Sequence, residues 1–576
     1  VTNEVDSTIE PYYFINPENA LPVLNLLDRY IDMPDENYNM AKPSKKGFDK
    51  VVLGLKRDRE YCNKVRAFAV EHPEAFFEEY RFITDLEHES LLREKVMPAL
   101  GKDIMRDLGH GLTAEQRKTP TKNLDPKGNI YFMNDIIHMK QELTAEIGCT
   151  FQAFNHVPGT GSLCRKDLIA RCANNYTDRY RDKPQCFDGK KFFPRTLALE
   201  NATECKEWFD YINSDAYRIE KEKKKIVYIR KIGIGMHQGE GVQPVDAEEE
   251  KKLRDTYENG KLCGKVWKSV LVQHYIENPL LIMGHKFDFR IYMLIASTNP
   301  IIVYYHDGFL RLSLSIYDKN STDKNVHLTN THLSKSLIKN VSEGDGTYLG
   351  MNETELKDYQ MWTMPELEEY LYEAKVISEP NWLNNYLRPQ FQKAFAHTAR
   401  MTESYFLPHS GVFEMFGLDF ILDEKLNLWF IECNASPQLI GTNPKKTEFL
   451  SKMLSDLFHI QYAYLRSRMK RVHQFMAKLA TIPDQKKNWK ALRKEFKELS
   501  KNKLEPEFPL PENNSFTLIV DKSLKGAAAY HGHIPPECVD DQGNIRRVKF
   551  LNSITVYMSN SKPFYFTRSI IKYQSK

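Results

Sequence analysis

The stretch Gly417–Pro437, GLDFILDEKLNLWFIECNASP, predicts two β-strands joined by a turn around Asp423–Leu426. With the turn there, Asp419 falls opposite Glu432, and Asn434 shares a face with Glu432 at i and i+2. The apolar residues between them indicate that at least one face of the hairpin is core. Two carboxylates and an amide suit Mg²⁺ bound jointly with phosphates. The hairpin therefore predicts a magnesium site, and a surface hairpin with outward polar residues is the alternative.

A second motif, KFDFR, begins a strand that we expect to continue to Ser297. Alternate residues of a strand share a face, so Lys286, Asp288 and Arg290 line one face and two phenylalanines line the other. Three charges on one strand face are unfavourable unless they are solvated or bound to something. The pattern leaves both a ligand site and a solvated face with an internal ion pair open.

Two shorter signals flank this strand. Arg311 lies in the strand-like run GFLRLSL and would add a second guanidinium, although a lone arginine there is usually just exposed. Thr329 and Asn330 offer short hydrogen-bonding side chains, with a plain turn as the alternative. The segment Gln273–Ile276 (QHYI) closes a predicted strand and could offer backbone groups to an adenine edge, unless it is an ordinary core strand.

A glycine-rich stretch, KIGIGMHQGEGV, runs from Lys231 to Val242 directly after a predicted strand. Glycines let backbone N–H groups approach phosphate oxygens, and the lysine supplies a point charge. The stretch lacks the G-K-[ST] of a P-loop and the spacing of a dinucleotide fingerprint. It therefore predicts either a phosphate-covering flap or a simple glycine-rich hairpin.

The amino-acid composition limits the classes of protein to which this chain can belong. The chain has 576 residues, with 81 basic against 77 acidic side chains and a net charge of +4. This balance does not indicate a nucleic-acid binder, so any basic surface must be local. No apolar run approaches the ~18–20 residues of a membrane helix. The nine cysteines include no C-x-x-C pair, so we expect neither a zinc site nor a disulfide scaffold, and a reduced, intracellular protein.

The order of patterns predicts an α+β protein in three parts. Residues 1–128 form a mostly helical extension, in which the stretch from Tyr61 to Leu86 has helical period. Residues 129–465 alternate short strands and helices, which we divide into 129–225, 226–340 with the glycine-rich and KFDFR motifs, and 341–465 with the metal hairpin. Residues 466–576 form a basic helix and a short β-like tail.

Together these motifs resemble the ATP-grasp enzymes, in which two β-rich layers clamp ATP. Further stretches, LCRKDLIAR, KFFPRTLAL, KFDFRIYMLI, HLTN, FEMFGLDFILD and IECNASP, are similar to signatures of the tubulin–tyrosine-ligase-like family. The resemblance covers about residues 130–457. It implies ATP-dependent ligation of an amino acid to a protein, with ATP and Mg²⁺ as cofactors, a free amino acid as substrate and tubulin as the usual acceptor.

The resemblance also implies roles for particular residues. Lys286, Arg290 and Arg311 correspond to catalytic positions, where they neutralise phosphate and acyl-phosphate oxygens. Asp419, Glu432 and Asn434 correspond to the magnesium ligands. The nucleotide-binding positions are Lys231, Gln238, Gly239, Glu240, Gly241, Gln273, His274, Tyr275, Ile276, Lys286, Asp288, Arg311, Thr329 and Asn330. Ile232 stands where the family usually has proline, and the flap is one residue longer, which puts the roles of His237 and Gln238 in doubt.

The overall texture of the sequence is most similar to the glycine-adding, chain-elongating branch of this family. We therefore expect a tubulin polyglycylase of the cytoplasm and cytoskeleton, in a cilium or axoneme, with neither nucleic acid nor membrane as partner. A glutamate ligase is the first alternative. The second is a structural microtubule-associated protein that keeps the fold as a scaffold. Tubulin tails are acidic, so we expect the basic stretches 464–471 and 486–503 to dock the acceptor.

Overall fold

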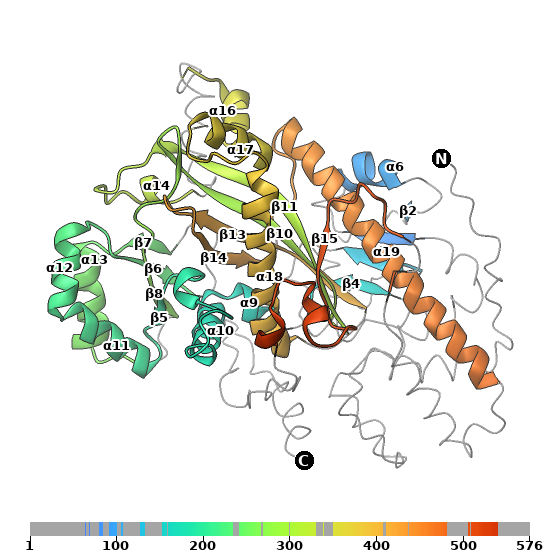
Figure 1. Cartoon of the computed structure of the whole chain (residues 1–576), viewed down its shortest axis with the longest axis horizontal. Coiled ribbons are helices and arrows are strands. Elements are labelled where there is room, and N and C mark those ends of the chain that lie inside the picture. The colour runs from blue at the N-terminus through green and yellow to red at the C-terminus, as the bar shows by residue number, and fades with distance from the viewer. Residues whose placement is uncertain are drawn as a thin grey trace, which may run out of the picture.

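The computed structural model describes residues 80–84, 91–100, 105–107, 127–132, 152–157, 159–233, 241–265, 269–298, 300–329, 350–406, 411–435, 437–480, 505–506 and 509–539, with residues 64, 68 and 338. These residues form two sheets of unequal size with helices around them (Figure 1). The architecture is α+β, as the sequence predicted, and the two sheets correspond to the two layers expected of an ATP-grasp-like fold.

The large sheet has eleven strands within the described residues. Its order is β12 (Met361–Trp362), β11 (Ile301–Ile316), β10 (His285–Thr298), β13 (Val412–Leu422), β4 (Ala153–Asn155), β3 (Ile130–Phe132), β1 (Tyr80–Thr84) and β2 (Met105–Asp107). Three further strands pair at its margins: β14 (Leu428–Asn434) with β13, β15 (Thr517–Asp521) with β11, and β9 (Leu281–Ile282) with β10. The long antiparallel strands β10, β11 and β13 form its centre.

Helices cover one face of this sheet and bury its apolar side chains. Phe287, Phe289 and Ile291 of β10 are buried there, as their alternation predicted. The covering elements are α9 (Gly161–Cys164), α10 (Lys166–Arg179), α17 (Met364–Glu373), η5 (Leu383–Leu387) and α18 (Arg388–Thr402). The long helix α19 (Pro444–Ala480) crosses the other face, beside η1 (Leu92–Val96) and α6 (Met97–Leu100) (Figure 1).

The small sheet has the order β5 (Thr196–Ala198), β8 (Val270–His274), β6 (Tyr228–Ile232) and β7 (Val242–Pro244). It forms a lobe of its own with α11 (Ala202–Ile212), α12 (Asp215–Lys223), α13 (Ala247–Leu253) and η4 (Arg254–Asn259) (Figure 1). Trp208 is fully buried at its centre. The side chains of Asn201, Ser214 and Asp246 cap the N-termini of the three α-helices, which explains where each begins.

The remaining short elements connect these layers. They are α14 (Lys324–His327), α16 (Glu353–Tyr359) and the 3₁₀ turns η3 (Gly189–Lys191), η6 (Glu403–Tyr405), η7 (Gly526–Tyr530) and η8 (Pro536–Cys538). Within the described residues no helix is both long enough and apolar enough to span a membrane.

Two expectations from the sequence are wrong. Tyr80–Thr84 is strand β1 rather than the end of a helix, because its alternating aromatic and β-branched residues pair in parallel with β2 and β3. Disulfides join Cys186 to Cys538 and Cys205 to Cys263, where we expected reduced thiols. These partners lie 352 and 58 residues apart in the sequence, so no local spacing motif could reveal them.

The structure describes only part of the two basic stretches that we expected to dock the acceptor. Helix α19 continues through the boundary expected at residues 465 and 466. Arg468, in the first basic stretch, is buried and donates to the Gln152 carbonyl at 3.0 Å, so its charge serves the interior of the fold. The stretch 486–503 lies outside the described residues, and its docking role stays a prediction.

Candidate functional site

The β13–β14 hairpin has the register that the sequence predicted. Asp419 pairs with Glu432 across the two strands, Gly417 pairs with Asn434, and the turn lies at Asp423–Leu426. The Asn434 amide donates to Asp419 Oδ2 at 3.3 Å. The three predicted magnesium ligands therefore lie together at one end of the hairpin, where it adjoins β10.

Three charged side chains of the neighbouring strands form a buried network with Asp419. We call Asp288, Arg290, Arg311 and Asp419 the charge network. Arg290 donates to Asp419 through Nε at 2.6 Å and Nη2 at 3.1 Å. Arg311 donates to Asp288 at 2.7 and 2.6 Å and also to Asp419 at 2.8 Å. Within the described part of the chain these bonds engage Nε and Nη2 of both arginines, and Nη1 of each is left for a ligand.

The backbone makes room for this network at two glycines. Gly308 has φ +69° at an irregularity of β11, and a Cβ there would lie 1.8 Å from the Arg290 carbonyl oxygen. This bulge joins two predicted segments, Ile301–Tyr305 and GFLRLSL, into one strand, β11. A Cβ at Gly417 would lie 2.8 Å from Arg290 Cδ. Both positions require glycine because the arginine or its backbone occupies the space.

Lys286 is buried beneath the network on β10. Its Nζ donates to the His327 carbonyl at 2.9 Å and to Tyr275 Oη at 3.2 Å, and it lies over the Tyr275 ring. Burial lowers the pKa of Lys286 to about 7, against the opposing effect of Asp288. Thr329 donates its hydroxyl to Asp288 at 2.5 Å, so this predicted residue also belongs to the site.

Lys231, on strand β6 of the small sheet, lies at the same site. Burial lowers the pKa of Lys231 to about 8, and its charged neighbours are Glu432, Lys166 and Asp419. Burial opposes the charge on Glu432, but Lys166 and Lys231 outweigh it and hold the Glu432 pKa below its usual value. Burial also opposes the charge on Asp419, and the two arginines of the network lower its pKa.

Lys166, at the start of α10, was not among the predicted site residues. Its Nζ lies 3.3 Å from Glu432 Oε2, and both side chains are one-fifth exposed. The only sequence signal for it was its place in LCRKDLIAR, which we used as a family signature without assigning a role. Two thiols lie beside this pair, with Cys164 Sγ 3.0 Å from Cys433 Sγ.

The segment Gln273–Ile276 passes from β8 toward the large sheet. The Gln273 side chain donates to Thr196 Oγ1 at 2.8 Å, and the amides of His274 and Tyr275 donate to the Arg195 and Val227 carbonyls. These groups are therefore engaged within the protein. Gln273 and His274 are also paired with β5 and β6, so the Ile276 amide and the carbonyls of Tyr275 and Ile276 are the candidates for an adenine edge.

Part of the predicted flap lies outside the described residues, namely Gln238, Gly239 and Glu240, and so does Asn330. The two ends of the flap are described: Gly241 has φ +73°, and its carbonyl accepts from Ile232 N at 3.1 Å. The glycine-rich stretch thus joins the antiparallel strands β6 and β7. It is a hairpin, and a phosphate-covering role is compatible with that geometry.

The donor set fits a magnesium ion shared with phosphates. The Glu432 carboxylate and the Asn434 oxygen are hard ligands, whereas Asp419 accepts from Arg290, Arg311 and Asn434 and would reach the ion only by exchanging one of these bonds. Three ligands are too few for six coordination, so phosphate and water oxygens would complete the shell. Among the described residues no three His, Cys, Asp or Glu side chains converge to hold a metal alone. The residues present therefore match a metal that arrives with a nucleotide.

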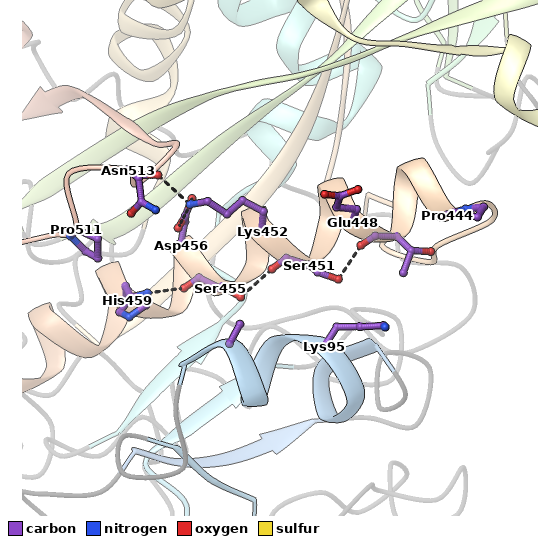
Figure 2. A pocket seen from close by; sticks show the side chains of 12 residues that line it. Lys95, Pro444, Glu448, Ser451, Lys452, Ser455, Asp456, His459, Pro511 and Asn513 are labelled. Carbon is purple, nitrogen blue, oxygen red and sulfur yellow. Dashed lines mark hydrogen bonds and ion pairs between the residues drawn. The ribbon is translucent and has the colours of Figure 1, made fainter. Parts of the chain in front are cut away.

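A pocket of about 880 Å³ lies elsewhere, between α19 and the η1–α6 segment. Figure 2 shows Lys95 facing α19, along which Ser451 and Ser455 bond to helix carbonyls and Lys452 pairs with Asp456. None of the predicted site residues lines it. The pocket therefore lies apart from the predicted site residues.

Comparison with known proteins gives a family match over most of this region. Residues 142–472 match the tubulin-tyrosine ligase family. Tubulin polyglutamylase TTLL7 from Mus musculus is 28% identical over 347 residues, which cover 57% of this chain and 33% of that protein. Protein polyglycylase TTLL10 from Mus musculus is 29% identical over 261 residues, covering 43% and 34%. The Homo sapiens protein named inactive polyglycylase TTLL10 is 28% identical over 262 residues, covering 43% and 35%. This chain spans about a third of the length of these relatives.

Proposed function

Because this chain belongs to the tubulin-tyrosine ligase family, we propose that it is an ATP-dependent ligase that joins an amino acid to carboxylates of a protein. The proposed acceptors are glutamates of tubulin tails, and the proposed amino acid is glycine. The observation that carries this proposal is the meeting of Lys231, Lys286 and the charge network with Glu432 and Asn434.

The residues of the site have complementary tasks in such a reaction. A carboxylate is a poor electrophile, so an acceptor carboxylate oxygen attacks the γ-phosphorus of ATP, the bond to the β-phosphate oxygen breaks, and ADP leaves. The product is an acyl phosphate. Lys231 and Lys286 neutralise the phosphates and the acyl phosphate, and Arg290 and Arg311 add the charge of the buried network, which leaves Nη1 of each arginine for another anion. The Ile276 amide and the carbonyls of Tyr275 and Ile276 hold the adenine edge.

The second step forms the new amide. The amine of the incoming amino acid attacks the acyl carbon, the C–O bond to phosphate breaks, and the nitrogen loses a proton to solvent. The protein contributes positioning and charge neutralisation rather than a covalent intermediate of its own. Asp419, Glu432 and Asn434 would hold Mg²⁺, which neutralises charge on the ATP phosphates when bound.

Glutamate is the alternative amino acid. The polyglutamylase TTLL7 matches 57% of this chain, whereas the polyglycylase TTLL10 matches 43%. Identity near 28% supports a glutamate ligase and a glycine ligase equally. The choice of glycine therefore depends on the overall similarity of the sequence to the glycine-adding branch.

A structural role without catalysis is the second alternative, and it has one observation in its favour. One relative carries the name inactive polyglycylase, so family membership alone does not establish activity. The complete set of Lys231, Lys286, Asp419, Glu432 and Asn434 supports an enzyme instead.

We propose a cytoskeletal location, in a cilium or axoneme. The two disulfides would have to form or persist there against a reducing environment.

Mass spectrometry tests the proposed function directly. Tubulin is incubated with the protein, ATP and Mg²⁺, with glycine in one series and glutamate in the other. We expect additions of glycine mass on tubulin tail peptides, and none without ATP. Additions of glutamate mass alone would replace glycine by glutamate, and no addition in either series would favour the structural alternative.

Nucleotide binding should take up protons. In the free protein the pKa values of Lys286 and Lys231 are lowered to about 7 and about 8, so both are partly neutral at pH 8. Bound phosphates favour the charged lysines, so we expect uptake of about one proton per ATP at pH 8 and much less at pH 6. Calorimetry in two buffers with different ionisation enthalpies measures this number. Proton release at pH 8 would contradict the placement of phosphates beside these lysines.

A further inference from the structure

Lys446 lies in the first turn of α19, and that turn is firmly anchored. The Asn443 side chain accepts from the Lys446 amide at 2.7 Å. The neighbouring Lys445 ammonium bonds to both carboxylate oxygens of Glu366 at 2.7 Å. One turn later, the Phe449 ring packs against Tyr292 and Phe309 of the large sheet. These contacts fix the backbone from which the Lys446 side chain projects.

The Lys446 side chain is on the sheet-facing side of the helix. Lys446 and Phe449 are three residues apart and so share a face. The residue is nine-tenths buried, with its Nζ 5.9 Å from the centre of the Phe309 ring. The pocket of Figure 2 lies along a different face of α19, which carries Glu448, Ser451 and Ser455.

Lys446 is a buried cation beside the charge network, in which Asp288 and Asp419 already balance the two arginines. Within the described part of the chain no carboxylate pairs with it, whereas Lys445 pairs with Glu366 and Lys452 with Asp456. Its charged neighbours are Arg290 and Arg311, and burial together with their charges lowers the pKa of Lys446 to about 8. Burying an ammonium beside two guanidiniums destabilises the fold, and this contact provides no compensating attraction. This arrangement is explained if an anion completes it.

The register of the sheet shows which end of the site this is. Phe309, beneath Lys446, pairs with Arg290 across the strands and stands two residues before Arg311 on β11. Lys446 therefore covers the strand face that carries the two arginines. The charged neighbours of Lys231 are Glu432, Lys166 and Asp419, and those of Lys286 are Asp288 and Lys231. The site thus has a lysine end for phosphates and an arginine end next to Lys446.

We propose that Lys446, with Nη1 of Arg290 and Arg311, forms a carboxylate subsite that binds the α-carboxylate of the incoming amino acid. This assignment rests on the proposed function and deepens it. The incoming amino acid needs a free amine for attack, so its α-carboxylate is the group by which the protein can hold it. For glycine the carboxylate is the only other functional group.

Kinetics of Lys446→Met and Lys446→Arg test the subsite. Methionine keeps the length of the stem over Phe309 and removes the charge. We expect the KM for glycine to rise about tenfold, the loss of one charge-assisted hydrogen bond, while the KM for ATP changes less than about twofold. Lys446→Arg should recover most of the loss. Lys206→Met removes an exposed lysine that pairs with Asp210 on α11, away from the site, and is the matched control, with both KM values unchanged.

Two results would overturn the subsite: an unchanged KM for glycine in Lys446→Met, or an equal rise in the KM for ATP, which would assign Lys446 to the phosphates. A merely structural lysine would lower the melting temperature when replaced. We expect Lys446→Met to keep or raise it, because the lost charge has no partner.

Direct binding separates this inference from the proposed function. Calorimetry with the protein loaded with a non-hydrolysable ATP analogue compares glycine with glycinamide, which lacks the carboxylate, and glutamate in a parallel series. We expect an amino acid to bind the wild-type protein, glycinamide not to bind, and Lys446→Met to weaken the binding about tenfold. If this pattern holds but no ligation occurs, the proposed function fails and the subsite stands. If ligation occurs and Lys446→Met binds the amino acid normally, the subsite fails and the function stands.

Discussion

Replacing Glu432 by glutamine should lower ligation about 100-fold while the protein stays folded. Glutamine keeps the shape of the side chain but removes the charge that faces Lys166 and Lys231. A neutral amide is a weaker ligand for Mg²⁺ than a carboxylate. The side chain is one-fifth exposed and sits at the margin of the sheet, so its loss of charge should cost little stability.

The dependence on magnesium identifies the cause of this loss. If Glu432 is a metal ligand, the turnover of Glu432→Gln should rise as Mg²⁺ is raised far above the level that saturates the wild type. Lys166→Met breaks the same ion pair without removing a metal ligand, and its dependence on Mg²⁺ should resemble that of the wild type. Glu424→Gln, in the exposed turn of the hairpin, is the matched control. Near-normal turnover of Glu432→Gln at ordinary Mg²⁺ would remove Glu432 from the metal site.

The hairpin could be predicted from sequence because its two signals are local. Strand alternation and a turn of four residues determine which side chains face one another, so Asp419 opposite Glu432 followed directly. The same alternation placed Lys286, Asp288 and Arg290 opposite the buried phenylalanines. The alternation of residues does not show whether a charged strand face is exposed to solvent. The structure shows that this face is buried, that Asp288 and Arg290 are in ion pairs, and that Lys286 donates to a carbonyl and a hydroxyl.

Other parts of the site depend on contacts between distant segments. Lys166 and Lys446 come from the starts of two helices, and only the folded chain brings them to β14 and β11. The sequence shows them as two lysines among 81 basic residues. The bulge at Gly308 interrupts the strand pattern of β11, so the sequence suggested two segments where the structure has one. Strand β1 was mistaken for helix because its partners β2 and β3 lie far along the chain.

Replacing Arg311 by leucine should lower the free energy of unfolding by about 3–5 kcal/mol, the range for breaking a buried ion pair by removing one partner. Arg311 is one-tenth exposed and bonds to both Asp288 and Asp419, so the variant leaves two buried carboxylates short of a guanidinium. Leucine fills part of the volume but satisfies neither oxygen. Urea unfolding followed by circular dichroism measures the change. Arg218→Leu, which removes an exposed arginine paired with Asp215, should cost less than about 1 kcal/mol.

The destabilisation of Arg311→Leu can come from buried carboxylates that lack a partner or from lost packing. Its pH dependence distinguishes these two causes. In the wild type the two arginines lower the pKa of Asp419 against the effect of burial, so its contribution to stability is present above the unfolded value near 3.9. That contribution disappears only as the pH falls through the lower folded pKa. In Arg311→Leu, protonation relieves the stranded carboxylates, so the difference from wild type should narrow from pH 7.5 to pH 5. A cavity costs the same at both pH values, and a constant difference would therefore assign the loss to packing rather than to the charge network.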